Sequence, residues 1–173
     1  MFSLFFAGIV WIELRIGRIS GIEEVAGNLN LRVIGSLPQI PRSAINSSSR
    51  RRRSRNNDWH RKLSESIDST RTMLLREADR ETMKLVMITS ALSSEGKTTL
   101  SSHLATSLVR AGRKVLLIDC DLRWPGIHSV FDNPLTPGLC ECLRRDADFD
   151  EVIYPASQEG LWILPAGDVN EEV

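Results

Sequence analysis

The 173-residue chain is long enough for one domain of ordinary size, and its 42% hydrophobic and 25% charged residues are typical of a globular protein. A formal net charge of zero gives no general indication of nucleic-acid binding. The cysteines, Cys120, Cys140 and Cys142, form neither a CxxC pair nor an even framework, so they are interpreted as buried or idle thiols rather than zinc ligands or disulfides.

The first segment, residues 1–14, begins with an apolar run over residues 1–12 that only Ser3 and Gly8 interrupt. As a helix, the run is about 18 Å long, shorter than the hydrocarbon core of about 30 Å. Two interpretations stay open, an interfacial or buried helix and the end of a membrane span. Residues 15–41 are interpreted as a juxtamembrane segment with one short strand over residues 31–37.

Residues 42–58 are rich in arginine and serine and lack apolar periodicity, which predicts a disordered linker. From Arg50 to Lys62 there are seven basic residues and one acidic residue. A solvated linker is the preferred interpretation, and attraction to anionic lipid headgroups is the alternative. No aromatic residues interleave with the arginines, so a nucleic-acid partner is not expected.

Residues 59–173 have the pattern of an α/β nucleotide-binding domain. Residues 59–78 repeat apolar or small residues at spacings of three and four, which predicts one helix with a buried face, made of Leu63, Ile67, Thr70, Leu74 and Ala78. An apolar run over residues 85–89 predicts a buried strand, residues 90–96 a loop, and residues 97–111 a helix that Gly112 ends. A second buried strand is predicted over residues 115–118, short helices over 126–131 and 139–145, and a third strand over 161–164. The prediction is therefore a P-loop NTPase-like parallel sheet flanked by helices and incomplete at its C-terminus.

The segment from Ala91 to Thr98 has the spacing of a Walker A phosphate loop, except that Ala91 occupies the position of the first glycine. Small residues allow backbone N–H groups to curl around phosphate oxygens, and the start of the next helix adds unpaired donors. Lys97 is expected to bind the β- and γ-phosphates of ATP, and Thr98 to supply a hydroxyl ligand to Mg²⁺. Ala91 matters only if its φ must be positive.

A second constellation, Asp119, Asp121 and Arg123, follows the predicted strand at 115–118. Ligands of open parallel sheets bind beyond the carboxyl ends of the strands, so these carboxylates are candidates for steering a nucleophile or a metal-bound water. The alternative is structural: one aspartate caps the next helix and Arg123 pairs with the other. Three aromatic residues, Phe131, Trp124 and Trp162, are expected to lie in the core.

Residues 88–99 and 115–123 together resemble the cytoplasmic domain of the bacterial tyrosine kinases (BY-kinases) of capsule and exopolysaccharide synthesis. That family pairs a Walker A loop with a Walker A′ motif, three apolar residues and then Asp-x-Asp-x-Arg, which Asp119, Asp121 and Arg123 match. Weaker likeness extends to residues 33–38 and 161–167. The family's motif Glu-x-x-Arg-x-x-Arg for ring assembly is matched by Glu65 and Arg71, but Asp68 replaces its middle arginine.

The resemblance implies an ATP- and Mg²⁺-dependent protein-tyrosine kinase domain, only part of which is present. The implied catalytic residues are Lys97, Asp119 and Asp121, and the implied metal ligands are Thr98 and Asp119. The implied nucleotide-binding residues are Ser93, Ser94, Glu95, Gly96, Lys97, Thr98, Thr99 and Arg123. The implied setting is the cytoplasmic face of the bacterial inner membrane, with membrane-embedded polysaccharide assembly machinery and a homo-oligomeric ring as partners. Two alternatives stay open: a vestigial or regulatory nucleotide-binding partner without catalysis, and a MinD/ParA-like ATPase.

Overall fold

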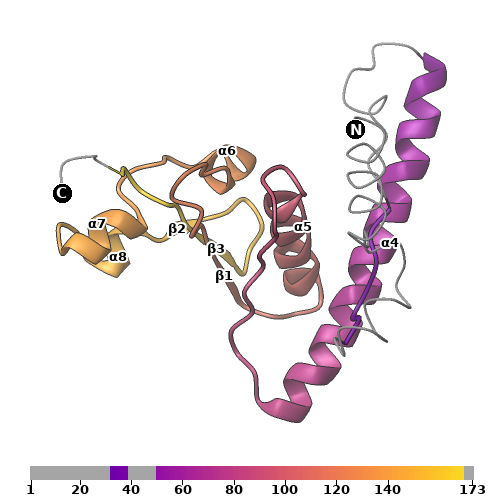
Figure 1. Ribbon diagram of the computed structural model, residues 1–173, viewed down its shortest axis with the longest axis horizontal. Coiled ribbons are helices and arrows are strands. Elements are labelled where there is room, and N and C mark those ends of the chain that lie inside the picture. Colours follow the sequence, from indigo (N-terminus) through magenta and orange to yellow (C-terminus); the bar gives the residue numbers. More distant parts are fainter. Residues whose placement is uncertain (1–31, 39–49, 170–173) are drawn as a thin grey trace, which may run out of the picture. The chain divides into compact units, whose positions relative to one another are not determined.

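The computed structural model describes residues 32–38 and 50–169, with the side chains of 50–57 excepted (Figure 1). The chain divides into two units, Met1–Ile34 and Gly35–Val173, and the second unit is described here by itself. The predictions made for residues 1–14 and for most of the juxtamembrane segment lie outside the described residues. None of the helices in the described part of the chain is long and apolar enough to span a membrane.

The unit begins with a long helix, α4, over Arg50–Glu81. The prediction of a disordered linker is therefore wrong from Arg50 to Asp58, while residues 42–49 lie outside the described part. Arginine is a good helix former, and no glycine or proline interrupts residues 50–81. Helical propensity thus extends the helix beyond the start of its apolar pattern, on which the prediction relied.

The buried face predicted for residues 59–78 is confirmed on α4, except that Ala78 is only half-buried. Leu63, Ile67, Thr70 and Leu74 are each less than one-tenth exposed. Leu63, Ile67 and Leu74 form a core cluster with Leu104 of the next helix, and partly buried hydrophobic residues pack around it: Trp59, Ile88, Leu100 and Leu108. Burial of this apolar surface is what holds the two helices together.

The strand predicted over residues 31–37 does not form within the described residues 32–38, which have no regular structure. Gly35 lies so close to α4 that a β-carbon on it would collide with the side chain of Thr70. Gly35 therefore packs against a helix rather than pairing with a sheet.

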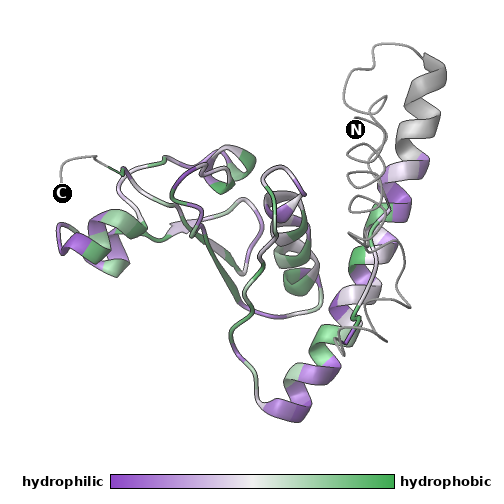
Figure 2. Cartoon of the chain, in the orientation of Figure 1, coloured by the Kyte–Doolittle hydropathy of each residue, from purple (hydrophilic) through white to green (hydrophobic). Residues whose placement is uncertain are grey.

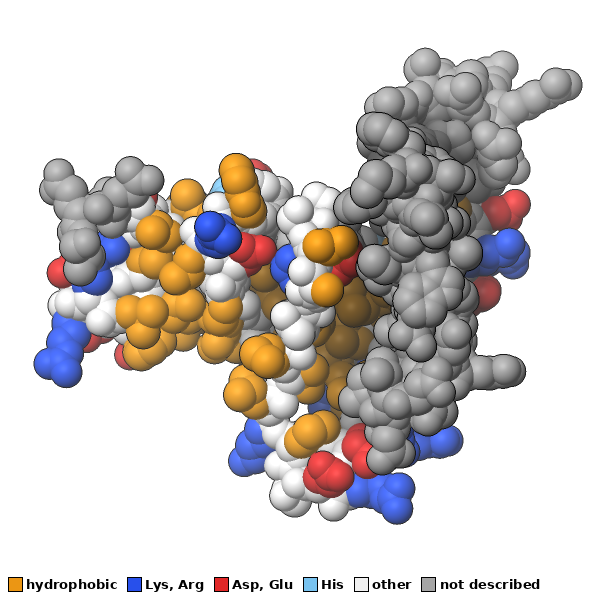
Figure 3. All heavy atoms as spheres, viewed as in Figure 1, with side chains coloured by type: hydrophobic (Ala, Val, Ile, Leu, Met, Phe, Trp, Pro, Cys, Tyr) orange, Lys and Arg blue, Asp and Glu red, His pale blue; other side chains and the backbone are white. Residues whose placement is uncertain are grey.

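The strand predicted over residues 85–89 is also wrong, because residues 83–90 are extended but paired with no strand in the described part of the chain. Leu85 and Met87 are 80% and 83% exposed. Figure 2 shows apolar residues along this connection between α4 and α5, and Figure 3 shows hydrophobic side chains standing out from it. An apolar run becomes a strand only where a neighbouring backbone can accept its hydrogen bonds.

Helix α5 (Lys97–Arg110) and strand β1 (Val115–Ile118) form as predicted, and Gly112 has the positive φ of 80° that ends a helix. Strand β3 (Leu161–Leu164) confirms the third predicted strand and pairs with β1 in parallel, with Val115 opposite Leu161. The two-residue strand β2 (Tyr154–Pro155) adds an antiparallel pair, so the sheet has the order β1-β3-β2. The sheet is therefore mixed rather than purely parallel.

One face of this sheet packs on α5 and on the short helix α6 (Ile127–Phe131). The buried residues of this contact are Ala105 and Ile127 from the helices and Leu161 and Ile163 from β3. Phe131 is partly buried against them. The other face carries Leu116 and Ile118, which are 44% and 37% exposed. The alternation of inward and outward residues along β1 is that of a strand covered on one side.

Helices α7 (Leu139–Arg144) and α8 (Phe149–Val152) follow α6, and α7 is joined tightly to the turn after β3. Leu139 and Cys140 donate backbone hydrogen bonds to the carbonyl oxygens of Pro165 and Ala166 at 2.8 and 2.9 Å. Glu141 accepts hydrogen bonds from the backbone N–H groups of Gly138 and Asp168 at 2.6 and 3.0 Å. These contacts fix the chain where it leaves the sheet.

Candidate nucleotide-binding site

The loop before α5 has the backbone shape expected of a phosphate loop. Ser94 and Gly96 have φ values of 62° and 93°, and Gly96 caps α5 without any side-chain hydrogen bond. The first N–H groups of α5 are therefore left without a capping side chain, as at anion-binding helix starts. The φ of Ala91 is not positive, so an alanine causes no backbone strain at the position of the first Walker A glycine.

Lys97 lies between the phosphate loop and the segment after β1. Its Nζ donates a hydrogen bond to Ser90 Oγ at 3.3 Å and is 3.7 Å from Asp121 Oδ2. Both charged side chains are about one-third exposed, so solvent screens this ion pair in part. The structure thus brings together two predicted site residues that are 24 positions apart in the chain, and it adds Ser90, which the sequence analysis did not single out.

Asp119 is buried, with 3% of its surface exposed, and both carboxylate oxygens accept backbone hydrogen bonds. Its Oδ1 accepts from the N–H of Asp121 at 3.1 Å, and its Oδ2 accepts from the N–H groups of Gly126 and Ile127, each at 3.0 Å. Because Gly126 is the N-cap of α6 and Ile127 its first residue, Asp119 satisfies the start of that helix. The structural alternative, an aspartate that caps the next helix, accurately describes these contacts.

The loop that Asp119 organises also reaches the start of α5. A β-carbon on Gly126 would lie 3.4 Å from Thr98 Cγ2 and 3.6 Å from Thr98 Oγ1, so the Gly126 backbone and the Thr98 side chain are separated by about the width of a methyl group. The candidate magnesium ligand Thr98 therefore lies beside the segment that carries both aspartates. Residues of the two predicted motifs thus lie close together, as the ion pair of Lys97 with Asp121 shows.

The other predicted site residues make no hydrogen bond or ion pair that joins the loop to the segment after β1 within the described part of the chain. Ser93, Ser94 and Glu95 are exposed on the loop, where Glu95 Oε2 accepts the N–H of Leu92 at 3.1 Å, and Thr99 is half-buried in the first turn of α5. Arg123 is exposed and makes no ion pair or hydrogen bond within the described residues. The pairing of Arg123 with an aspartate, which the structural alternative predicts, does not occur.

Trp124 corrects a prediction, because it is 80% exposed and so does not belong to the core. Trp162 and Phe131 are half-buried. The reason is local: Trp124 stands on the loop between β1 and α6, and the backbone contacts of Asp119 and Asp121 hold this loop at the surface. Apolar character alone did not distinguish a loop aromatic from a core one.

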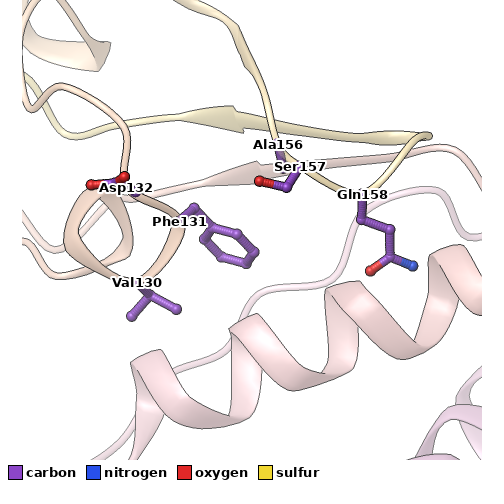
Figure 4. Close-up of a pocket in the computed structure, with 6 residues that line it drawn as sticks. All are labelled: Val130, Phe131, Asp132, Ala156, Ser157 and Gln158. Carbon is purple, nitrogen blue, oxygen red and sulfur yellow. The ribbon is translucent and has the colours of Figure 1, made fainter.

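A separate pocket of about 300 Å³ lies between the end of α6 and the turn before β3, and Figure 4 shows the Phe131 ring pointing into it. Its lining residues are Val130, Phe131, Asp132, Ala156, Ser157 and Gln158. None of them comes from the phosphate loop or from residues 119–124, so this pocket is distinct from the candidate site.

Comparison with known proteins agrees with this geometry. Residues 86–129, which hold both halves of the site, match the family described as the CobQ/CobB/MinD/ParA nucleotide binding domain. The chain is 40% identical over 91 residues to the tyrosine-protein kinase YwqD of Bacillus subtilis (strain 168), a match that covers 53% of this chain and 38% of YwqD. It is 34% identical over 89 residues to the succinoglycan biosynthesis transport protein ExoP of Rhizobium meliloti (strain 1021), covering 51% of this chain and 11% of ExoP.

Among solved structures, the kinase domain of the Escherichia coli tyrosine kinase ETK superposes with a TM-score of 0.71 at 25% identity, covering 87% of this chain and 62% of that domain. The fold is thus that of a P-loop nucleotide-binding domain, and the resemblance to bacterial tyrosine kinases of polysaccharide synthesis is confirmed. The MinD/ParA-like ATPase alternative has less support, because the named relatives are kinases or polysaccharide transport proteins. The chain spans less than half the length of these curated relatives.

Proposed function

We propose that this chain binds ATP with Mg²⁺ at the loop before α5 and transfers the γ-phosphoryl group to a tyrosine hydroxyl. One observation carries the proposal: Lys97 Nζ lies 3.7 Å from Asp121 Oδ2, at the end of a loop with positive φ at Ser94 and Gly96. Lys97, as a phosphate-binding cation, thus lies next to Asp121, a carboxylate suited to binding an acceptor hydroxyl. The names of the relatives supply the reaction class.

In this proposal the backbone N–H groups of residues 93–96 surround the phosphate oxygens, and the free N–H groups at the start of α5 add their dipoles. Lys97 offsets the charge that gathers on the β- and γ-phosphates during transfer. Thr99 and Arg123 are the remaining nucleotide-binding residues of the proposal. Thr99 lies in the first turn of α5, and Arg123 is exposed two residues after Asp121.

The residues present fit a magnesium ion that the nucleotide helps to hold. Within the described residues there is no group of three or more His, Cys, Asp or Glu side chains suited to a metal. Mg²⁺ is usually held by one or two protein oxygens together with phosphates and water. We propose Thr98 Oγ1 as the direct ligand. Asp119 retains lone pairs beyond its three N–H contacts for a metal-bound water. Bound Mg²⁺ supplies charge neutralisation on the β- and γ-oxygens.

Asp121 is proposed as the residue that orients the acceptor. In the transfer step the tyrosyl oxygen forms a bond to the γ-phosphorus, the bond between this phosphorus and the β–γ bridging oxygen breaks, and ADP leaves with the electron pair. The hydroxyl proton passes to Asp121, which stands beside Lys97 and is half-buried. Asp119 acts mainly through the loop, since backbone N–H groups occupy both of its oxygens.

The setting is part of the same proposal. ExoP is named as a biosynthesis transport protein for a polysaccharide, which supports a partner in polysaccharide assembly. A place at the cytoplasmic face of the bacterial inner membrane is part of the proposal through the family resemblance. A homo-oligomeric ring is proposed from the resemblance alone. Sedimentation of the full chain with and without Mg²⁺-ATP tests it, and a monomer under both conditions would contradict it.

The first test measures Mg²⁺-dependent ATP binding by calorimetry for the wild type and for Lys97→Ala. Loss of the phosphate-binding charge should weaken binding about tenfold or more. Lys114→Ala is the matched control, because Lys114 is exposed and lies outside the loop. The second test incubates the chain with γ-labelled ATP and a tyrosine-containing peptide.

Label on tyrosine supports the kinase, and free phosphate alone would support a hydrolase instead. Binding without turnover would support a nucleotide-binding regulatory partner. Absence of Mg²⁺-dependent binding, or binding that Lys97→Ala leaves unchanged, would overturn the whole proposal.

A further inference from the structure

Trp124 is an exposed aromatic residue in an unusual place. Its side chain is 80% exposed, although tryptophan is the largest apolar side chain and exposing it to water is costly. It stands on the loop between β1 and α6, directly after the Walker A′ arginine. Neither the fold nor the nucleotide chemistry described above uses its indole ring.

The loop holds Trp124 in a defined position. The Trp124 N–H donates to Asp121 Oδ1 at 3.1 Å, and two residues later Gly126 N–H donates to Asp119 Oδ2 at 3.0 Å. Between these anchors lies Pro125, whose ring fixes φ. The loop is therefore anchored at Trp124 itself, through Asp121, and again at Gly126, through Asp119, while the Trp124 side chain is exposed.

The same loop marks which end of the nucleotide Trp124 adjoins. Asp121, which accepts the Trp124 N–H, is also 3.7 Å from Lys97 Nζ, and a β-carbon on Gly126 would lie 3.4 Å from the Thr98 side chain. Lys97 and Thr98 of a phosphate loop act at the β- and γ-phosphates and their metal ion. Trp124 thus adjoins the γ-phosphate end, where an acceptor must approach in line, and not the end that holds the base.

We propose that Trp124 binds the aromatic ring of the acceptor, by stacking or edge contact with a tyrosine side chain whose hydroxyl points to Asp121. This inference rests on the proposed function and adds the residue that selects a phenolic over an aliphatic hydroxyl. Aromatic pairs favour offset or edge-to-face contact and contribute more than their buried area alone. A serine or threonine acceptor offers no ring to the indole.

The experiment uses the full chain, loaded with Mg²⁺ and a non-hydrolysable ATP analogue. Fluorescence anisotropy measures its affinity for a labelled peptide with one tyrosine and for the same peptide with serine in that place. Trp124→Ala should weaken the tyrosine peptide about fivefold and leave the serine peptide and the analogue unchanged. Trp124→Phe should retain most of the affinity, since a ring remains. Phe149→Ala is the matched control, because Phe149 is an aromatic residue that is 57% exposed on α8.

The outcomes separate this inference from the proposed function. If the wild type fails to bind the analogue, the proposed function fails and the acceptor role fails with it. If the analogue binds but the wild type does not prefer tyrosine over serine, or Trp124→Ala leaves that preference intact, the acceptor role alone is overturned. If Trp124→Ala weakens the analogue instead of the peptide, the indole serves the nucleotide, which also overturns it. The exposed position makes misfolding of either variant unexpected, and far-UV circular dichroism checks this.

Discussion

Asp68 on α4 accepts a hydrogen bond from Ser107 on α5, and the two residues tie the helices together beside their apolar contact. The same oxygen, Asp68 Oδ1, lies 3.1 Å from Arg71 Nη1 and 3.1 Å from Arg110 Nη2. Arg71 also donates to Ser107 Oγ at 3.0 Å. The residue that departs from the ring-assembly motif of the BY-kinases is thus the centre of a polar cluster within the chain, and Arg71 is turned toward α5.

Asp68→Asn should lower the free energy of unfolding by about 1 kcal/mol, because two ion pairs lose their charge while the partly exposed site keeps some hydrogen bonding. Urea denaturation followed by circular dichroism measures this. Asp58→Asn is the control, since Asp58 has only an exposed pair with Arg61 at 3.9 Å. Equal stability of the two variants would contradict a structural role for the cluster.

Stability should also fall in acid. The hydrogen bond from Ser107 lowers the pKa of Asp68 below its ordinary 3.8; burial opposes this, and Arg110 and Arg71 add to it. Burial alone would raise the pKa of Glu141, but donation from Asp168 and Gly138 and the charge of Arg144 lower it below 4.5. Carboxyls with depressed folded pKa values add stability that is complete above their unfolded values and is lost as pH falls through the folded ones.

The wild type should therefore lose stability progressively below about pH 4.5, and Glu141→Gln should flatten that part of the curve. Denaturation midpoints measured between about pH 6 and about pH 2.5 test this. A midpoint that stays constant over this range, or the same slope in Glu141→Gln, would count against the assignment.

Asp119→Asn should disrupt the loop between β1 and α6. An amide offers one acceptor oxygen where three backbone N–H groups now point at a carboxylate, and it turns an NH₂ donor against some of them. We expect a loss of about 2 kcal/mol in stability, together with weaker Mg²⁺-ATP binding. Asp150→Asn, at an exposed position on α8, is the control. Unchanged stability would contradict the role of Asp119 as the cap of α6. Unchanged ATP binding would show that Asp119 is not needed for the nucleotide.

Gly138→Ala should destabilise the chain by about 2 kcal/mol or more through steric overlap. An added β-carbon would lie 2.5 Å from both Gly167 N and Pro165 O, which are backbone atoms and cannot move aside. Gly126→Ala is the comparison, because its β-carbon would meet the Thr98 side chain at an ordinary 3.4 Å. Thermal melting of both variants tests this, and similar melting temperatures would refute the steric account.

Met87→Glu should reduce aggregation and leave the unfolding free energy within about 0.5 kcal/mol of wild type, because Met87 is 83% exposed and buries little. Its neighbours Leu85 and Val86 are also exposed. A run of exposed apolar side chains that pairs with no strand in the described part of the chain can associate with the same run of another molecule. Light scattering at increasing protein concentration measures the effect. Greater scattering from the variant would contradict it.

The sequence was a good guide where a pattern is satisfied locally. Apart from the start of α4, the helices α4 to α7 appeared where expected, because a helix is hydrogen-bonded within itself. Strands β1 and β3 also appeared where expected, and each has the other as its pairing partner. Residues 85–89 have the composition of a strand, but composition does not supply a pairing partner, and in the described chain β1 pairs only with β3. Arg50 to Asp58 became helical because a helix extends itself through its own backbone bonds.

The candidate site could be predicted to the level of its motifs. Spacing identified Lys97, Thr98, Asp119 and Asp121, and the start of α5 meets the segment after β1 through the ion pair of Lys97 with Asp121. Spacing did not show that Asp119 holds the loop while Asp121 pairs with Lys97. This difference depends on which backbone N–H groups face each carboxylate. Ser90 carried no signal in the sequence beyond its place at the start of the loop.

The contact between Lys97 and Asp121 means that these two charges neutralise each other until a competitor arrives. In the proposed function, a triphosphate competes with Asp121 for the Lys97 ammonium, so part of the attraction for the ligand is spent in separating the two side chains. The same exchange frees Asp121 at the moment when the anion is seated. Under the proposed function, Asp121 would then be free to accept a proton only while ATP is bound, so the order of binding would control the transfer step.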